Sequence, residues 1–155
     1  MHEMLRVLQK NGFVVIENFF PKELMDRVYD ALTTWDETEK WNNFTYSDFY
    51  STNPDQLNTY KNRLEIVLPF VDPFETVLST VHDSNLIDLM STYANEKSNF
   101  NEPINLFMAT SIMSRYGASE QTIHHDYGYE ASMIKINVAV HDIPQESGPT
   151  SFCPW

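Results

Sequence analysis

The stretch around which the chain is organised runs from Gln121 to Trp155 and reads QTIHHDYGYEASMIKINVAVHDIPQESGPTSFCPW. Within it, His124 and Asp126 stand on either side of His125. Alternate residues of a β-strand share one face, so a strand here would direct His124 and Asp126 to one side and His125 to the other. An imidazole nitrogen and a carboxylate oxygen are two ligands of the 2-His-1-carboxylate arrangement that binds Fe(II). The pair is therefore the candidate metal site.

The spacing has other readings, because a surface turn or a hydrogen bond between histidine and aspartate produces the same pattern. By strand parity, His125 is expected to pack outward or make a hydrogen bond instead of binding the metal. His141, beside Asp142, is expected to lie in a turn, and His82 to be a surface or capping residue. The single cysteine, Cys153, has no Cys-x-x-Cys partner and is expected to be a small buried residue.

Hydrophobic periodicity predicts the remaining elements. Apolar residues at three- and four-residue spacing predict helices at residues 4–10, 21–34, 74–81 and 86–94, and Asn11-Gly12 predicts the end of the first helix. Apolar, β-branched or alternating runs predict strands at residues 13–16, 104–113 and 132–141. Residues 115–118 are assigned to a turn, and residues 121–126 to the strand that carries the metal pair. The nearly continuous apolar run of 104–113 predicts a strand covered on both faces. Residues 36–60 have no stable period and are assigned to a loop, either a lid over a substrate pocket or an irregular segment whose aromatic residues fill the core.

The strand predicted at 132–141 alternates in polarity. One face carries the apolar side chains of Ile134, Ile136, Val138 and Val140, which we expect to pack on the helices. The other face carries a mixed set that includes Lys135 and Asn137. That mixed face is expected to line the inside of a sheet sandwich, where a polar ligand could bind.

Three segments resemble the phytanoyl-CoA dioxygenase family of Fe(II)/2-oxoglutarate oxygenases, in the same order along the chain. Residues 11–32, NGFVVIENFFPKELMDRVYDAL, are similar to the opening strand and helix of the family. Residues 115–129, RYGASEQTIHHDYGY, are similar to its GA-x-x-Q-x-x-H-x-D segment, and residues 136–154, INVAVHDIPQESGPTSFCP, to the strand and Gly-Pro turn that follow. Residues 40–105 match only loosely. The resemblance implies that His124 and Asp126 hold Fe(II).

The resemblance also implies the fold and the cofactor. The expected fold class is α+β, with N-terminal helices packed on an incomplete double-stranded β-helix of the jelly-roll, cupin-like type. The expected co-substrate is 2-oxoglutarate, and Asn137 is the candidate hydrogen-bond donor to it. The family often carries a larger side chain, such as Trp, at the position of Asn137. The implied reaction couples oxidative decarboxylation of 2-oxoglutarate to hydroxylation of a small-molecule substrate.

The second metal-binding histidine of the family, and the arginine that pairs with the far carboxylate of 2-oxoglutarate, would follow the Gly148-Pro149 turn and have no counterpart here. His141 precedes that turn and cannot replace the histidine. We therefore expect residues 1–155 to be the N-terminal part of a longer dioxygenase domain, and to be catalytically silent alone. The alternative is a non-catalytic binding or interaction protein that keeps the scaffold and a vestigial metal site.

Length and composition limit the function further. The 155 residues fit one domain, and a hydrophobic content of 42% with 14% aromatic residues is typical of a globular protein. A net charge of -12 would repel a phosphate backbone, so no nucleic-acid partner is expected. Charges at Glu3, Arg6 and Lys10 interrupt any signal peptide, and no apolar run is long enough for a membrane span. These features, with a single cysteine, predict a cytoplasmic protein without membrane partners; the oligomeric state stays open.

Overall fold

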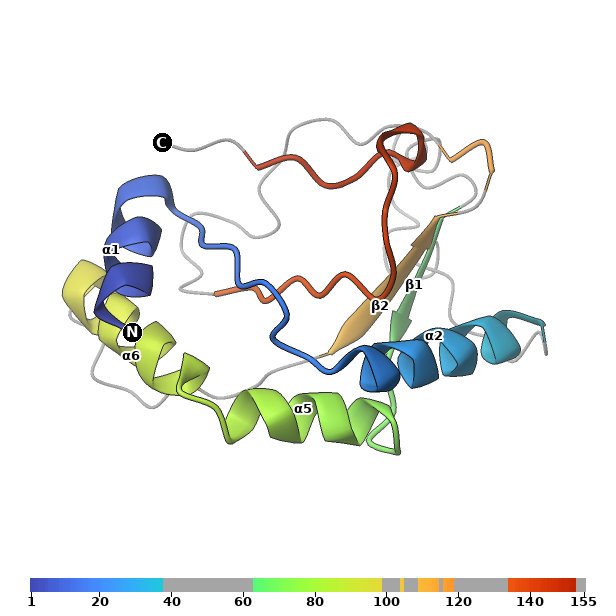
Figure 1. The fold of residues 1–155 in the computed structure, drawn as a ribbon, viewed down its shortest axis with the longest axis horizontal. Coiled ribbons are helices and arrows are strands. Elements are labelled where there is room, and N and C mark those ends of the chain that lie inside the picture. Colours follow the sequence, from blue (N-terminus) through green and yellow to red (C-terminus); the bar gives the residue numbers. More distant parts are fainter. Residues whose placement is uncertain (38–62, 99–103, 105–108, 115, 119–133, 153–155) are drawn as a thin grey trace, which may run out of the picture.

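The computed structural model describes residues 1–37, 63–98, 104, 109–114, 116–118 and 134–152 (Figure 1). In these residues four α-helices, one antiparallel strand pair and one short 3-10 helix follow each other along the chain. They are α1 (His2–Asn11), α2 (Lys22–Glu37), β1 (Arg63–Val67), α5 (Phe74–His82), α6 (Leu86–Ser98), β2 (Thr110–Ser114) and η1 (Gln145–Ser147). None of the helices in the described residues is both long and apolar enough to cross a membrane.

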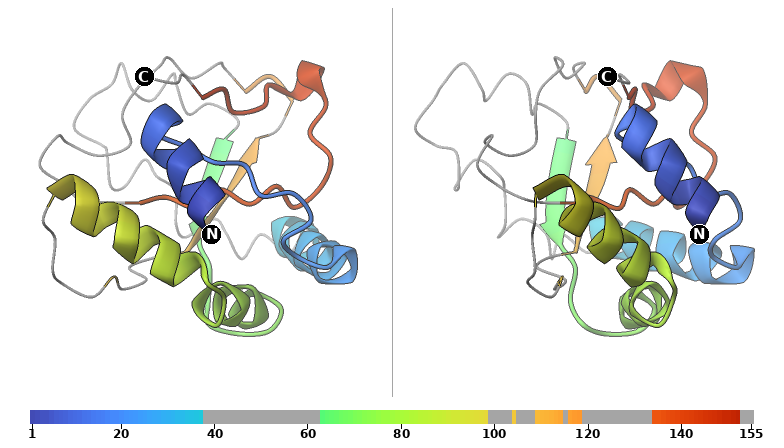
Figure 2. Two further views of the ribbon diagram at one scale, coloured as in Figure 1. Left: turned by 60° about the vertical axis from the view of Figure 1, so that its left-hand side comes forward. Right: turned by 90° about the vertical axis from the view of Figure 1, so that its left-hand side faces the viewer.

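Helix α1 confirms the helix predicted at residues 4–10. Leu8 is its buried residue, and the helix packs on α6 (Figure 2). Gly12 ends it in the left-handed region, with φ 79°, and its backbone N–H donates to the Leu8 carbonyl at 2.8 Å. A glycine adopts this conformation without the steric cost of a side chain, so the Asn11-Gly12 stop in the sequence works as predicted.

Helices α2 and α5 share the main core. The apolar side chains of α2 recur at helical spacing and are buried against Phe74, the first residue of α5, in a cluster formed by Leu24, Met25, Val28, Leu32 and Phe74. Phe74 is only 1% exposed. The helix predicted at 21–34 is confirmed and continues to Glu37.

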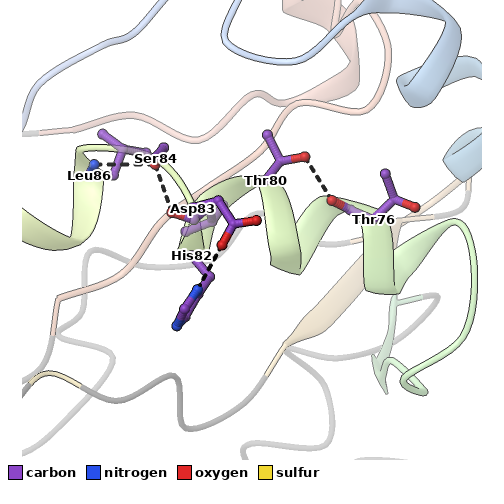
Figure 3. A network of polar contacts seen from close by, with 7 residues as sticks. Thr76, Thr80, His82, Asp83, Ser84 and Leu86 are labelled. Carbon is purple, nitrogen blue, oxygen red and sulfur yellow. Dashed lines mark hydrogen bonds and ion pairs between the residues drawn. The ribbon is translucent and has the colours of Figure 1, made fainter.

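Helices α5 and α6 confirm the predicted pair at 74–81 and 86–94, although α6 continues to Ser98. Figure 3 shows the junction, where the Ser84 hydroxyl donates to the Val81 carbonyl at 2.7 Å. The same hydroxyl accepts a hydrogen bond from the Leu86 N–H at 3.2 Å. It thus binds a carbonyl at the end of α5 and a free N–H at the start of α6, which explains why the polar junction residues separate two helices.

The strand pair corrects the sequence analysis in two ways. β1 pairs antiparallel with β2, with Glu65 opposite Ile112, and no strand was predicted at residues 63–67. β2 confirms a strand within the predicted segment 104–113, but its burial is one-sided, because Ile112 is 50% exposed while Met113 packs against the core. The prediction that both faces are covered was therefore wrong for β2. Residues 105–108 lie outside the described residues.

The prediction of a buried strand at 13–16 was wrong. These residues connect α1 to α2 without belonging to a strand, and Val15 is 73% exposed. Phe13 instead stacks on Phe152, with ring centroids 5.3 Å apart, so this connection lies against the C-terminal part of the described chain. β-branched composition favours extended backbone, but only a neighbouring strand makes that backbone part of a sheet.

The prediction of a strand at 132–141 was also wrong in the described part, 134–141, where no residue belongs to a strand. Figure 1 shows this segment running across the molecule toward β2. Val140 packs on the α2–α5 core as predicted, but Ile136 and Val138 are 38% and 36% exposed. Asn137 is exposed as well. The segment thus contacts the core at its C-terminal end. The alternating apolar and polar residues do not form one buried face and one polar face.

Candidate metal centre

His124 and Asp126, the predicted metal ligands, lie outside the described residues, as do His125 and Cys153. Described residues lie on both sides of His124 and Asp126 in the sequence. β2 ends at Ser114, a turn at residues 116–117 follows with Gly117 at φ 79°, and after residue 118 the chain is described again from residue 134. The turn confirms the sequence prediction for the residues after β2. The assignment of the metal ligands stays a prediction from the sequence.

Asn137, the predicted contact to 2-oxoglutarate, is the one candidate site residue that the structure describes. It lies in the segment 134–140 with an exposed side chain. An amide side chain offers two N–H donors and one carbonyl acceptor, so an exposed Asn137 is open to a carboxylate ligand. Its position relative to His124 and Asp126 lies outside what the described residues show.

Two histidines of the described residues, His82 and His141, have structural surroundings. His82 has an 82% exposed side chain, and its Nδ1 lies 3.0 Å from the Asp83 carboxylate (Figure 3). His141 donates from Nδ1 to the Asp142 carbonyl at 2.6 Å, and its ring meets the Tyr29 ring edge-on at a centroid distance of 5.3 Å. These contacts agree with the predicted surface and turn roles. Among the described residues, no group of three His, Cys, Asp or Glu side chains could hold a metal ion.

An open hollow of about 540 Å³ lies on the polar face of α5 and its junction with α6. Both threonine hydroxyl groups that line it already have partners, since Thr76 donates to the Asp72 carboxylate at 2.9 Å and Thr80 to the Thr76 carbonyl at 2.8 Å. A solvated helix face explains these groups without a ligand. The lining residues are Glu75, Thr76, Ser79, Thr80, Asp83 and Ser84.

The resolved electrostatic shifts in the described residues come from ion pairs at the surface. The Arg27 guanidinium, followed by the Thr76 hydroxyl, holds the pKa of the Asp72 carboxyl below its ordinary value of 3.8. Arg6 lowers the pKa of Glu3 in the same way within α1, again mainly through a side-chain hydrogen bond. The Arg27–Asp72 pair joins α2 to the residue two places before α5. It adds a surface contact between these two segments.

This ion pair predicts an acid-dependent contribution to stability. Because the pKa of Asp72 is lower in the folded chain, the contribution is present above pH 3.8 and is lost as the pH falls toward the folded-state pKa. We expect Asp72→Asn to lower the free energy of unfolding near neutral pH, and the difference from wild type to shrink below about pH 4. Urea unfolding across this range measures the effect. Glu75→Gln, which removes an exposed carboxylate from the first turn of α5, is the matched control. A difference that does not change with pH would contradict the assignment.

The phytanoyl-CoA dioxygenase (PhyH) family model matches residues 8–154, which is nearly the whole chain. The chain therefore belongs to the PhyH family. PhyH proteins are in general Fe(II)/2-oxoglutarate-dependent oxygenases, and the match includes His124, Asp126 and Asn137. No curated protein and no solved structure matches the chain.

Proposed function

We propose that the protein is a Fe(II)/2-oxoglutarate-dependent dioxygenase that hydroxylates a small molecule. The observation that carries this proposal is the PhyH match over residues 8–154, within which the sequence holds a His-x-Asp pair. The expected fold of the family, helices packed on a double-stranded β-helix, is part of the same proposal. The described helices α2 and α5, which form a core on one side of β2 through Met113, are compatible with it.

The donor chemistry of the predicted site fits Fe(II). The neutral imidazole of His124 supplies a nitrogen, and the ionised carboxyl of Asp126 supplies an oxygen and a negative charge. Bound Fe(II), with 2-oxoglutarate and oxygen, supplies the oxidising power for hydroxylation of an unactivated C–H bond. The protein contributes orientation and the exclusion of water.

Asn137 is proposed to orient the co-substrate. Its amide N–H groups can donate to a carboxylate of 2-oxoglutarate, which fixes the ligand without adding charge to the site. The exposure of Asn137 in the described chain supports this assignment, because the amide is accessible to a ligand.

Anaerobic titration of residues 1–155 with Fe(II), and then measurement of succinate formed from 2-oxoglutarate after oxygen is admitted, test the proposal. We expect saturable Fe(II) binding, because His124 and Asp126 are two of the three protein ligands that the family uses. We expect succinate formation well below about 1 per second, the lower end of typical enzymatic rates, because the sequence identifies no third ligand. Faster turnover would show that this chain or a partner subunit supplies it. Absence of Fe(II) binding would contradict the metal centre.

A further inference from the structure

Asn11 and Gly12 form a chemically sensitive pair at the end of α1. Asn11 is the last residue of the helix, and Gly12 follows in the left-handed conformation, with φ 79° and ψ -6°. An asparagine side chain followed by glycine is prone to internal attack, because glycine has no side chain to shield its backbone nitrogen. Both residues are partly exposed, so water can reach them.

The reaction needs only the chain and water. The backbone nitrogen of Gly12 loses its proton and bonds to the side-chain carbonyl carbon of Asn11. The bond from that carbon to the amide nitrogen breaks, and the leaving nitrogen takes up the proton and departs as ammonia. Water then opens the five-membered imide at either of its carbonyl groups. The products carry aspartate or isoaspartate at position 11, so the net change is replacement of an amide by a carboxyl group.

The structure opposes this reaction as long as α1 is intact. The Gly12 N–H that must become the nucleophile donates to the Leu8 carbonyl at 2.8 Å. The helical backbone of Asn11 belongs to the same last turn. Leu8 is the buried residue of α1 and is only 8% exposed. The helix packs on α6, and the Gln9 side-chain amide donates a hydrogen bond to the Glu96 carboxylate of α6. The last turn must therefore open before the nitrogen can attack.

We propose that Asn11-Gly12 is a site of spontaneous deamidation whose rate is controlled by the docking of the last turn of α1. Deamidation of Asn11 in turn favours opening of the last turn of α1. A new carboxylate at the C-terminal end of a helix is unfavourable for the helix dipole. The isoaspartate product also adds a carbon to the backbone, which displaces the Gly12 cap from the Leu8 carbonyl. The modified chain should therefore have a loosened α1 on α6.

The experiment incubates the 155-residue chain at mildly alkaline pH, folded and in urea, and follows the Asn11 peptide by mass spectrometry and isoaspartate by enzymatic methylation. We expect conversion in the folded chain to be at least about tenfold slower than in urea, since local opening limits it. Asn137, exposed and followed by the branched Val138, is the internal control and should convert slowly in urea. Hydrogen exchange of the Gly12 amide in the same samples reports the opening itself.

Substitutions test whether the docking of α1, and not the exposure of Asn11 alone, controls the deamidation rate. Leu8→Ala, which weakens the docking, and Gln9→Ala, which leaves the core untouched, should both raise the folded rate and the Gly12 exchange rate, with no change in urea. Gln145→Ala, an exposed glutamine in η1, is the matched control and should change neither rate. The proposal is overturned if conversion is equal in the folded chain and in urea, if Asn11 does not convert in urea, or if neither α1 variant raises the folded rate.

Discussion

Replacement of His124 or Asp126 by alanine is expected to lower the affinity of the protein for Fe(II) by more than about 100-fold, because loss of even an outer partner of a metal ligand typically costs about 10–100-fold. Each substitution removes one of the two predicted protein ligands. Titration of the folded variants with Fe(II) under anaerobic conditions measures the loss. In any form of the protein that turns over 2-oxoglutarate, both variants should abolish Fe(II)-dependent succinate formation.

His125→Ala is the matched control, since it removes the same side chain one position away. If residues 121–126 form a strand, His125 faces away from the metal and most of the Fe(II) affinity should remain. Circular dichroism of all three variants checks that the helices are intact. Equal losses of affinity in the three variants would contradict the parity argument, and a loss confined to His125→Ala would assign the metal to the opposite face.

Phe74→Ala is expected to lower the free energy of unfolding by about 3–5 kcal/mol, the usual cost of deleting a fully buried phenylalanine ring. The ring is 1% exposed and lies among the buried side chains of α2, so its loss leaves a cavity where α2 and α5 meet. A loss of this size is a large part of the stability of a single domain. Urea unfolding followed by circular dichroism measures it as a lower midpoint.

Phe70→Ala is the control for the core prediction. Phe70 precedes α5 by four positions and is 74% exposed, so its removal should change the free energy of unfolding by no more than about 0.5 kcal/mol. Similar losses from the two substitutions would show that Phe70 is buried in solution, or that Phe74 is not the centre of the α2–α5 core.

The sequence was most informative for the helices. α2 was predicted from apolar residues three and four positions apart, and the same residues, such as Val28 and Leu32, form its buried face. The end of α1 was predicted from Asn11-Gly12, and Gly12 has the left-handed conformation that this signal indicates. Both features depend on residues within one or two turns of each other, so a single segment contains the necessary information.

For the candidate site, the prediction depends on residue chemistry, because the described structure does not include the predicted metal ligands. His124 and Asp126 were chosen for their ligand types and their spacing, and they stay predictions because they lie outside the described residues. The PhyH match confirms the family that these residues suggested. Asn137 was chosen for its place on an expected strand, and the described segment 134–140 is not part of one. Its proposed role therefore rests on its amide chemistry and its exposure.

The sequence by itself determined the helices, the family and the residue types of the candidate metal site. Only the tertiary structure decided which extended segments join a sheet and which apolar side chains are covered. Residues 13–16 and 134–140 have the composition of strands but are not paired, while Arg63–Val67, for which no strand was predicted, pairs with Thr110–Ser114. The physical reason is that a helix forms its backbone hydrogen bonds within one segment, whereas a strand needs a partner far away in the sequence. Local composition cannot specify that partner, and side-chain burial on a strand depends on it.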